Sequence, residues 1–213
     1  MFNRTKSTIA RFSILLFAAV QVPLYAQDEG ALRTPKGDIA LELVGQVLNV
    51  PATPTSEQYG YLSFVRGIDT VFTSTFHNET TALFTFYTAA NTTQVINNGN
   101  LRIVDRIGTT TIYFNDAPNG NFAVPNTFAS GTPILTMSLK QQVILDLVGN
   151  TFTAVNINTV TSRSAFVVYG NKFHFGHVGE QFRTFISGRG NSTGTPAGFV
   201  IGGYVVPIAE STQ

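Results

Sequence analysis

The chain has 213 residues and a formal net charge of +1, and 12% of its residues are charged, about half of the usual share. Its basic residues are scattered rather than clustered, which argues against a nucleic-acid-binding surface. The sequence contains no cysteine, which excludes disulfides, thiolate metal sites and cysteine nucleophiles.

The N-terminal segment has the layout of a secretory signal peptide. Arg4, Lys6 and Arg11 form a basic start, and Phe12–Val22 is an uncharged, mostly apolar stretch. This stretch is shorter than the about 20 residues that a membrane-spanning helix needs. Ala26 then offers a cleavage point. Because cysteine-free export is common in bacterial envelopes, we expect a secreted or periplasmic bacterial protein.

Cleavage would change both the length and the charge of the chain. Removal of residues 1–26 leaves 187 residues with 10 basic and 12 acidic side chains, a net charge of −2. That length suits a single domain with an adequate core. We expect a flexible lead-in over 27–37, one β domain over 38–208 and a short tail over 209–213.

Segments rich in β-branched and aromatic residues, separated by turn residues, predict strands along the whole domain. In the first half the expected strands are Asp38–Val50, bulged at Gly45, then Gln58–Arg66, Ile68–Phe76 and Thr80–Ala90. The last of these is apolar on both faces, which is typical of a strand buried on both sides.

An Asn-Gly pair within Ile96–Asn100 predicts a turn. The next expected element is a hairpin of Leu101–Ile107 and Thr109–Phe114 around Gly108. The segment Asn115–Pro133 has no sustained period, and its length suggests a lid or binding loop.

The second half continues the strand pattern. The expected elements are a long bent strand Ile134–Val148, a Gly-Asn turn into Phe152–Ser162, a hairpin turned at Gly170-Asn171, and strands Glu180–Gly190 and Phe199–Ile208. About ten short strands without a clear helix indicate an all-β fold, either a single antiparallel barrel or a sandwich.

The stretch Lys172–Phe185 carries the most concentrated set of candidate site residues. His174, His177 and Glu180 are spaced three apart, which would place them together on a helix. Two glycines and several phenylalanines favour strands instead, where that spacing points the two histidines to opposite faces. We therefore expect no metal site and no cofactor there. Each histidine stays either a ligand-binding candidate or a partly buried structural residue.

Three further residues are candidates for ligand binding. Arg183 alternates with Gln181 and Phe185, so it is either the partner of a buried carboxylate or an anchor for an anion. Tyr61 and Tyr87 belong to the recurring aromatic residues of the strands. In a barrel some of these would line a ligand cavity, and otherwise they form a packed aromatic core.

The segment Val178–Gly190, "VGEQFRTFISGRG", carries a faint family resemblance. A Gly, then Phe-Arg, then Gly precede the last strand, which resembles the segment near the end of dirigent and allene-oxide-cyclase proteins. The Gly-Gly-Thr-Gly opening of that segment is missing here, since "HVGE" stands in its place. The resemblance implies a small secreted antiparallel barrel, dirigent-like or calycin-like in architecture, and no catalytic residue is carried over from it.

The functional expectation is a non-catalytic secreted barrel. Such a protein would bind a small apolar ligand, or serve as a surface or matrix component, and it would bind no nucleic acid. One alternative is a barrel enzyme of isomerase or cyclase type that draws its acid–base residues from His174, His177, Glu180 or Arg183. Another is a small outer-membrane barrel, which the low content of charged residues and the many aromatic residues favour.

The signal-peptide prediction is tested by the mass of the exported protein. We expect export to remove residues 1–26, so that the mature chain begins at Gln27 by intact mass spectrometry and N-terminal sequencing. Leu16→Arg, a charge in the apolar stretch, should block export. An exported protein that keeps its first 26 residues would contradict the prediction.

Overall fold

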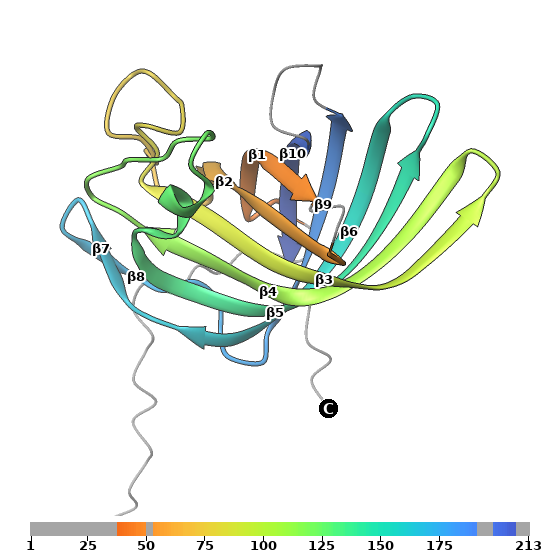
Figure 1. The fold of residues 1–213 in the computed structure, drawn as a ribbon. Helices are drawn as coiled ribbons and strands as arrows, with labels where there is room; N and C mark the ends of the chain where they lie inside the picture. Colours follow the sequence, from red (N-terminus) through yellow and green to blue (C-terminus); the bar gives the residue numbers. More distant parts are fainter. Residues whose placement is uncertain (1–37, 50–52, 191–197, 208–213) are drawn as a thin grey trace, which may run out of the picture.

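The computed structural model describes residues 38–49, 53–190 and 198–207. The expected signal peptide, lead-in and C-terminal tail lie outside these residues. Eight of the described strands form one closed antiparallel barrel in the order β1-β10-β9-β6-β5-β4-β3-β2 (Figure 1). The all-β, single-barrel prediction is therefore confirmed, and the alternative of a sandwich is wrong, because β1 pairs with β10 along its length and leaves no open edge.

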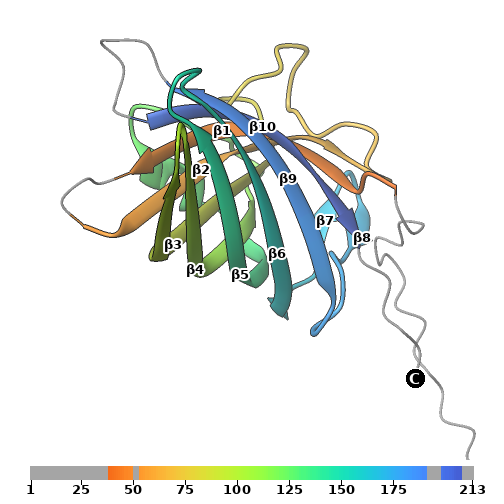
Figure 2. The ribbon, with the colours of Figure 1, turned by 90° about the vertical axis from the view of Figure 1, so that its right-hand side faces the viewer.

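The elements have the following bounds. They are β1 (Leu41–Asn49), β2 (Thr55–Val65), β3 (Phe84–Asn98), β4 (Leu101–Phe114), the short 3₁₀ helix η1 (Pro125–Ala129), β5 (Thr132–Asp146), β6 (Thr151–Arg163), β7 (Phe166–Val168), β8 (Asn171–Phe173), β9 (Gln181–Gly190) and β10 (Gly198–Pro207). Strands β7 and β8 form a separate hairpin. The long strands β3 to β6 run side by side (Figure 2).

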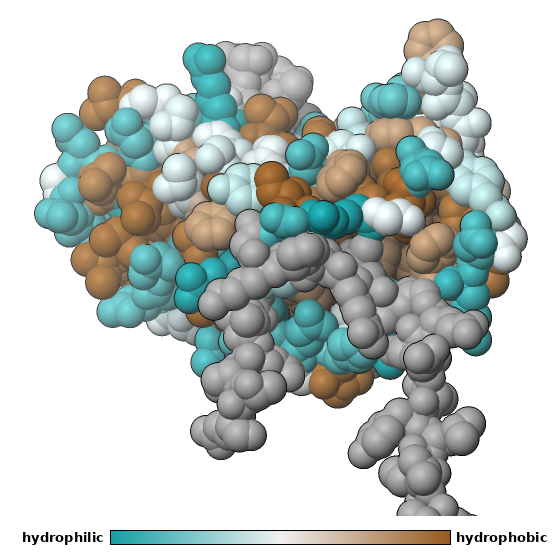
Figure 3. Space-filling view, turned by 180° about the vertical axis from the view of Figure 1, so that it is seen from behind, coloured by the Kyte–Doolittle hydropathy of each residue, from teal (hydrophilic) through white to brown (hydrophobic). Residues whose placement is uncertain are grey.

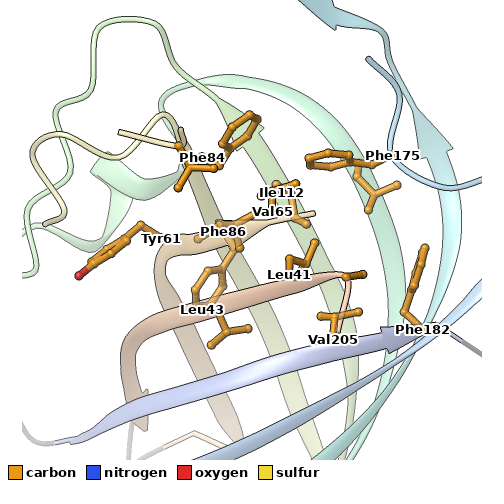
Figure 4. Packing of buried hydrophobic residues seen from close by; sticks show 14 of the residues in the cluster. Leu41, Leu43, Tyr61, Val65, Phe84, Phe86, Ile112, Phe175, Phe182 and Val205 are labelled. Carbon is orange, nitrogen blue, oxygen red and sulfur yellow. The ribbon is translucent and has the colours of Figure 1, made fainter. Parts of the chain in front are cut away.

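Alternation along each strand decides which side chains fill the barrel. On β5, for example, Leu139, Gln141 and Val143 are buried, whereas their neighbours Lys140 and Gln142 are exposed. The same period of two recurs on β1, β6 and β9. Apolar side chains from all eight strands therefore meet in the interior, and Figure 4 shows part of this packing.

One end of the barrel is closed by an aromatic plug, which consists of Phe84, Phe114, Phe166, Phe173 and Phe175. The ring of Phe84 is fully buried and lies 5.5 Å from those of Phe114 and Phe166 and 5.8 Å from that of Phe175. The hairpin β7–β8 supplies Phe166 and Phe173. The plug thus ties that hairpin to the barrel wall. The β3–β4 and β5–β6 hairpins lie at the opposite end, which we call the hairpin end.

The long connection between β4 and β5 covers the outside of the barrel. Phe128 from η1 is fully buried and packs 5.4 Å from the Tyr59 ring and 4.9 Å from the Phe122 ring. The hydroxyl of Thr85 donates to the backbone oxygen of Phe128 at 2.8 Å. The expected loop is confirmed, and its phenylalanines anchor it to the outer face of β2 and β3.

The strand expected over Ile68–Phe76 is wrong. Only an isolated bridge between Phe72 and Ala82 forms there. Polar side chains bond the backbone locally instead, as when the Ser74 hydroxyl accepts from the backbone N–H of Phe76 at 3.2 Å. Such local bonds compete with ladder pairing, so the segment becomes a loop that buries Val71 and Phe72.

The hairpin expected around Gly108 is also wrong, because β4 runs without a turn from Leu101 to Phe114. Gly108 pairs directly with Ala90, and a Cβ at this glycine would lie 2.1 Å from the Ala89 carbonyl oxygen. The glycine marks a close approach of two strands rather than a change of direction.

Smaller differences concern bulges and turns. The irregularity in β1 falls between Glu42 and Leu43 instead of at Gly45. The β7–β8 turn is confirmed but lies one residue early, at Tyr169 and Gly170, which both have positive φ. In the described part of the chain, no helix has the length and apolarity needed to cross a membrane.

The aromatic plug predicts a steep stability difference between two phenylalanines. Phe84→Ala should lower the free energy of unfolding by about 3–5 kcal/mol, because it opens a cavity among packed rings. Phe76→Ala is the matched control, since Phe76 is 76% exposed, and it should change stability by no more than about 0.5 kcal/mol. Urea unfolding followed by far-UV circular dichroism measures both. Equal effects would contradict the plug.

Candidate functional site

A row of polar side chains crosses the barrel interior near the hairpin end. The strand register places Arg106 of β4 opposite Gln141 of β5, and Gln141 opposite Asn156 of β6. All three lie on the inner faces of their strands, and Gln58 of β2 reaches the same level from across the barrel. These side chains therefore form one polar layer across the interior.

Gln141 is the centre of this layer. Its Nε2 donates to Asn156 Oδ1 at 2.9 Å and to Gln58 Oε1 at 3.3 Å. Its Oε1 accepts from Gln58 Nε2 at 3.0 Å and from Arg106 Nη1 at 3.1 Å. Because an amide both donates and accepts, one side chain satisfies three neighbours in a buried setting. The layer is thereby held in one arrangement.

A hollow of about 40 Å³ lies on the hairpin-end side of this layer. Its polar lining consists of Gln58, Arg106, Gln141 and Asn49. Its apolar lining consists of Val47, Val104, Val143, Leu145, Phe152 and Phe199. The register steps from Gln141 through Val143 to Leu145 toward the hairpin end. The hollow thus has a polar floor and hydrocarbon walls.

Two aromatic rings form one wall of this hollow. The rings of Phe152 and Phe199 meet edge to face at 5.0 Å. Phe152 is opposite Gly188 of β9, and a Cβ at this glycine would lie 2.4 Å from the Phe152 ring. The glycine therefore leaves the space that the ring occupies.

The rest of the barrel is mostly filled. Two further hollows of about 30 Å³ each lie deeper, one around Thr88, Thr110 and Asn158 and one beside Phe175 and Phe182. A buried water needs at least about 10–15 Å³, so each of these hollows has room for about two water-sized groups. The interior as it stands accepts the end of a molecule rather than a whole drug-sized ligand.

Arg106 is the unusual residue of the floor. Its Nη2 donates to Asn49 Oδ1 at 3.1 Å, while its Nε is buried and has no hydrogen-bond partner. Within the described part of the chain, no carboxylate lies within 4.0 Å of its guanidinium. Burial lowers the pKa of Arg106, and arginine nevertheless keeps its charge at neutral pH.

The histidines and glutamate of the Lys172–Phe185 stretch lie elsewhere. β8 ends at Phe173, and the chain then bends, so the expected strand alternation does not apply to it. The backbone N–H of His177 donates to Glu180 Oε2 at 2.8 Å, and Glu180 thereby holds the turn before β9. His174 is half-buried and His177 is exposed. Neither lines any of the three interior hollows, and a ligand-binding role for them stays a prediction.

Arg183 lies on the outer face of β9 and is exposed, as its alternation with buried Phe182 and Thr184 requires. Tyr61 also points out of the barrel (Figure 4), where it is buried against Phe72 at a ring distance of 6.0 Å. Both side chains therefore face away from the hollows. Among the described residues, no group of three or more His, Asp or Glu could hold a metal ion.

The tyrosine hydroxyls under the β4–β5 loop have altered acidity. Burial, a hydrogen bond from the phenol to Glu57 and nearby charges raise the pKa of Tyr87 to about 12. Burial and the charge of Glu79 raise the pKa of Tyr61. Both groups are thus neutral phenols at physiological pH, consistent with packing on the outer wall.

Sequence reasoning missed Arg106, Gln141 and Asn49. The sequence does carry a sign of Arg106, because Arg102, Val104 and Arg106 occupy every second position of β4 and therefore share one face. The partners of Arg106, which are Gln141 and Asn49, are remote in sequence, and no local pattern connects them to it.

Comparison of the chain with known proteins finds no match. No family model, no curated protein and no solved structure is significantly similar to it.

The polar layer predicts that two adjacent glutamines differ in their effect on stability. Gln141→Leu should lower the free energy of unfolding by about 1–3 kcal/mol, because it leaves buried partners unsatisfied. Gln142→Leu is the control, since Gln142 is exposed and bonds only Asp105, at 3.2 Å. It should change stability by no more than about 0.5 kcal/mol. Chemical unfolding of both variants would contradict the role of the layer if their midpoints coincide.

Proposed function

We propose that this protein is a non-catalytic binding barrel, exported to the periplasm or the medium, that takes up part of a small, mainly apolar molecule at the hairpin end. The observation that carries the proposal is the hollow with hydrocarbon walls above a fixed polar floor. Ligand sites in proteins are typically apolar concavities with a few placed polar groups.

The chemistry of the lining favours binding over catalysis. The hollow presents hydrocarbon, carboxamide and guanidinium groups. Acid–base catalysis by an isomerase or cyclase calls for groups that exchange protons near neutral pH, such as imidazole or a carboxyl. Amides and arginine instead orient a ligand by hydrogen bonds.

The outer surface favours an aqueous setting over an outer membrane. Glu42 on β1, Lys140 on β5 and Arg183 on β9 are exposed and face outward. A membrane barrel presents a continuous apolar band to lipid. Figure 3 shows a face on which hydrophobic residues are interspersed with hydrophilic ones instead.

The size of the hollow limits what enters it. An engineered cavity of about 150 Å³ holds one benzene molecule, whereas this hollow measures about 40 Å³. A flexible chain can insert its end and leave the remainder along Leu145, Phe152 and Phe199. A straight aliphatic chain therefore suits the site better than a rigid ring system.

The proposal is tested with 1-octanol as the probe. Titration calorimetry should detect binding to the purified protein, and octanol should shift the methyl NMR signals of Val104, Val143 and Leu145. Val104→Phe, which fills the hollow, should weaken binding by about tenfold or more, a loss of about 1.4 kcal/mol.

Val155→Phe is the matched control, because Val155 lies on the outer face of β6 and is 41% exposed. It should leave octanol affinity unchanged. Both variants are checked for a native circular dichroism spectrum. Absence of binding, or methyl shifts confined to the outer wall, would overturn the proposal.

A further inference from the structure

We infer that the hollow at the hairpin end selects an anionic amphiphile, a carboxylate with an aliphatic tail, whose head group pairs with the guanidinium of Arg106. This inference rests on the proposed function and specifies its ligand class.

Arg106 has unused capacity toward an anion. A guanidinium has five N–H donors in a fixed fork that matches a carboxylate. Two interactions of Arg106 are formed, with the neutral amide oxygens of Gln141 and Asn49. Its Nε is buried and unsatisfied. A half-buried charge is costly unless it is paired, so a bound anion would compensate the burial of this cation.

The acidic residues of β4 and of the neighbouring strand β5 are engaged elsewhere. Asp105 points to the outer face of β4, where it accepts a hydrogen bond from Gln142 at 3.2 Å. Asp146 accepts from the backbone N–H of Val148 at 2.9 Å and so holds the β5–β6 turn. The sequences between β1 and β2 and between β9 and β10 contain no acidic residue. Within the part of the chain that the structure describes, Arg106 thus has no carboxylate counter-ion.

A second cation extends the positive potential toward the hairpin end. Arg102 lies on the same face of β4 as Arg106, is exposed, and donates from Nε to Asn97 Oδ1 at 3.2 Å. A positive group at the entrance of a low-dielectric site attracts anions and raises their rate of association. The two arginines therefore act at the entrance and at the floor.

The layering of the hollow sets the orientation of the ligand. Arg106, Gln141 and Gln58 are at the floor, whereas Val143 and Leu145 follow toward the hairpin end. A carboxylate would enter first and pair with the guanidinium of Arg106. The hydrocarbon tail would then lie between the valine walls and the Phe152 and Phe199 rings.

The test compares three probes by titration calorimetry at neutral pH. Sodium octanoate has both charge and tail, 1-octanol has the tail alone, and sodium acetate has the charge alone. We expect octanoate to bind about tenfold or more tightly than octanol, and acetate to bind weakly. Arg106→Met should remove this preference by weakening octanoate about tenfold, and leave octanol within about threefold.

Arg183→Met on the outer face is the control and should change neither affinity. If octanol and octanoate bind equally to the wild-type protein, the anion inference fails and the proposed function survives. If neither binds, the proposed function fails as well. If acetate binds as tightly as octanoate, the site is a simple anion site and the amphiphile inference is wrong.

A second measurement keeps the inference testable should Arg106→Met fold poorly. The Nε–H resonance of Arg106 in the wild-type protein should move when octanoate is added and stay in place with octanol. An unchanged resonance with bound octanoate would overturn the pairing.

Discussion

The pairing of β1 with β10 is the constraint on which the rest of the molecule depends. This pairing closes the sheet, and closure divides every strand into an inner and an outer face. Inner residues must then share a narrow interior, which the chain fills with aliphatic and aromatic side chains. The polar layer, the aromatic plug and the hollow at the hairpin end all exist because the barrel has an inside and two ends.

The two ends of the barrel are built from different kinds of side chain. At one end, stacked and edge-to-face rings around Phe84 exclude water and attach the β7–β8 hairpin. At the other end, the amides of Gln58, Gln141 and Asn156 satisfy one another and place Arg106 above them. Buried polar networks fix one arrangement when their members are bonded. A rigid floor with one unsatisfied donor is a suitable base for recognising a charged group.

Much of this fold follows from local patterns in the sequence. Alternation predicted the long strand β5, and the turn residues predicted the β7–β8 hairpin, because these signals depend on neighbours in sequence. The strand expected over Ile68–Phe76 does not form, because polar side chains such as that of Ser74 bond the backbone locally there. The turn predicted at Gly108 does not form, because this glycine instead allows a close contact with Ala89, which is remote in sequence. The residues of the candidate site were not predicted for the same reason, because Arg106, Gln141 and Gln58 meet only through the register of strands that are distant in sequence. The regular spacing of His174, His177 and Glu180, in contrast, belongs largely to a turn.

We place the head of an anionic amphiphile at Arg106, and a crystal structure of the protein grown with octanoate tests that placement most directly. We expect a carboxylate oxygen within hydrogen-bonding distance of the Arg106 guanidinium, with the tail between Val143 and the Phe199 ring. Octanoate found only on the outer wall, or bound at the hairpin end with its tail toward Gln141, would contradict it.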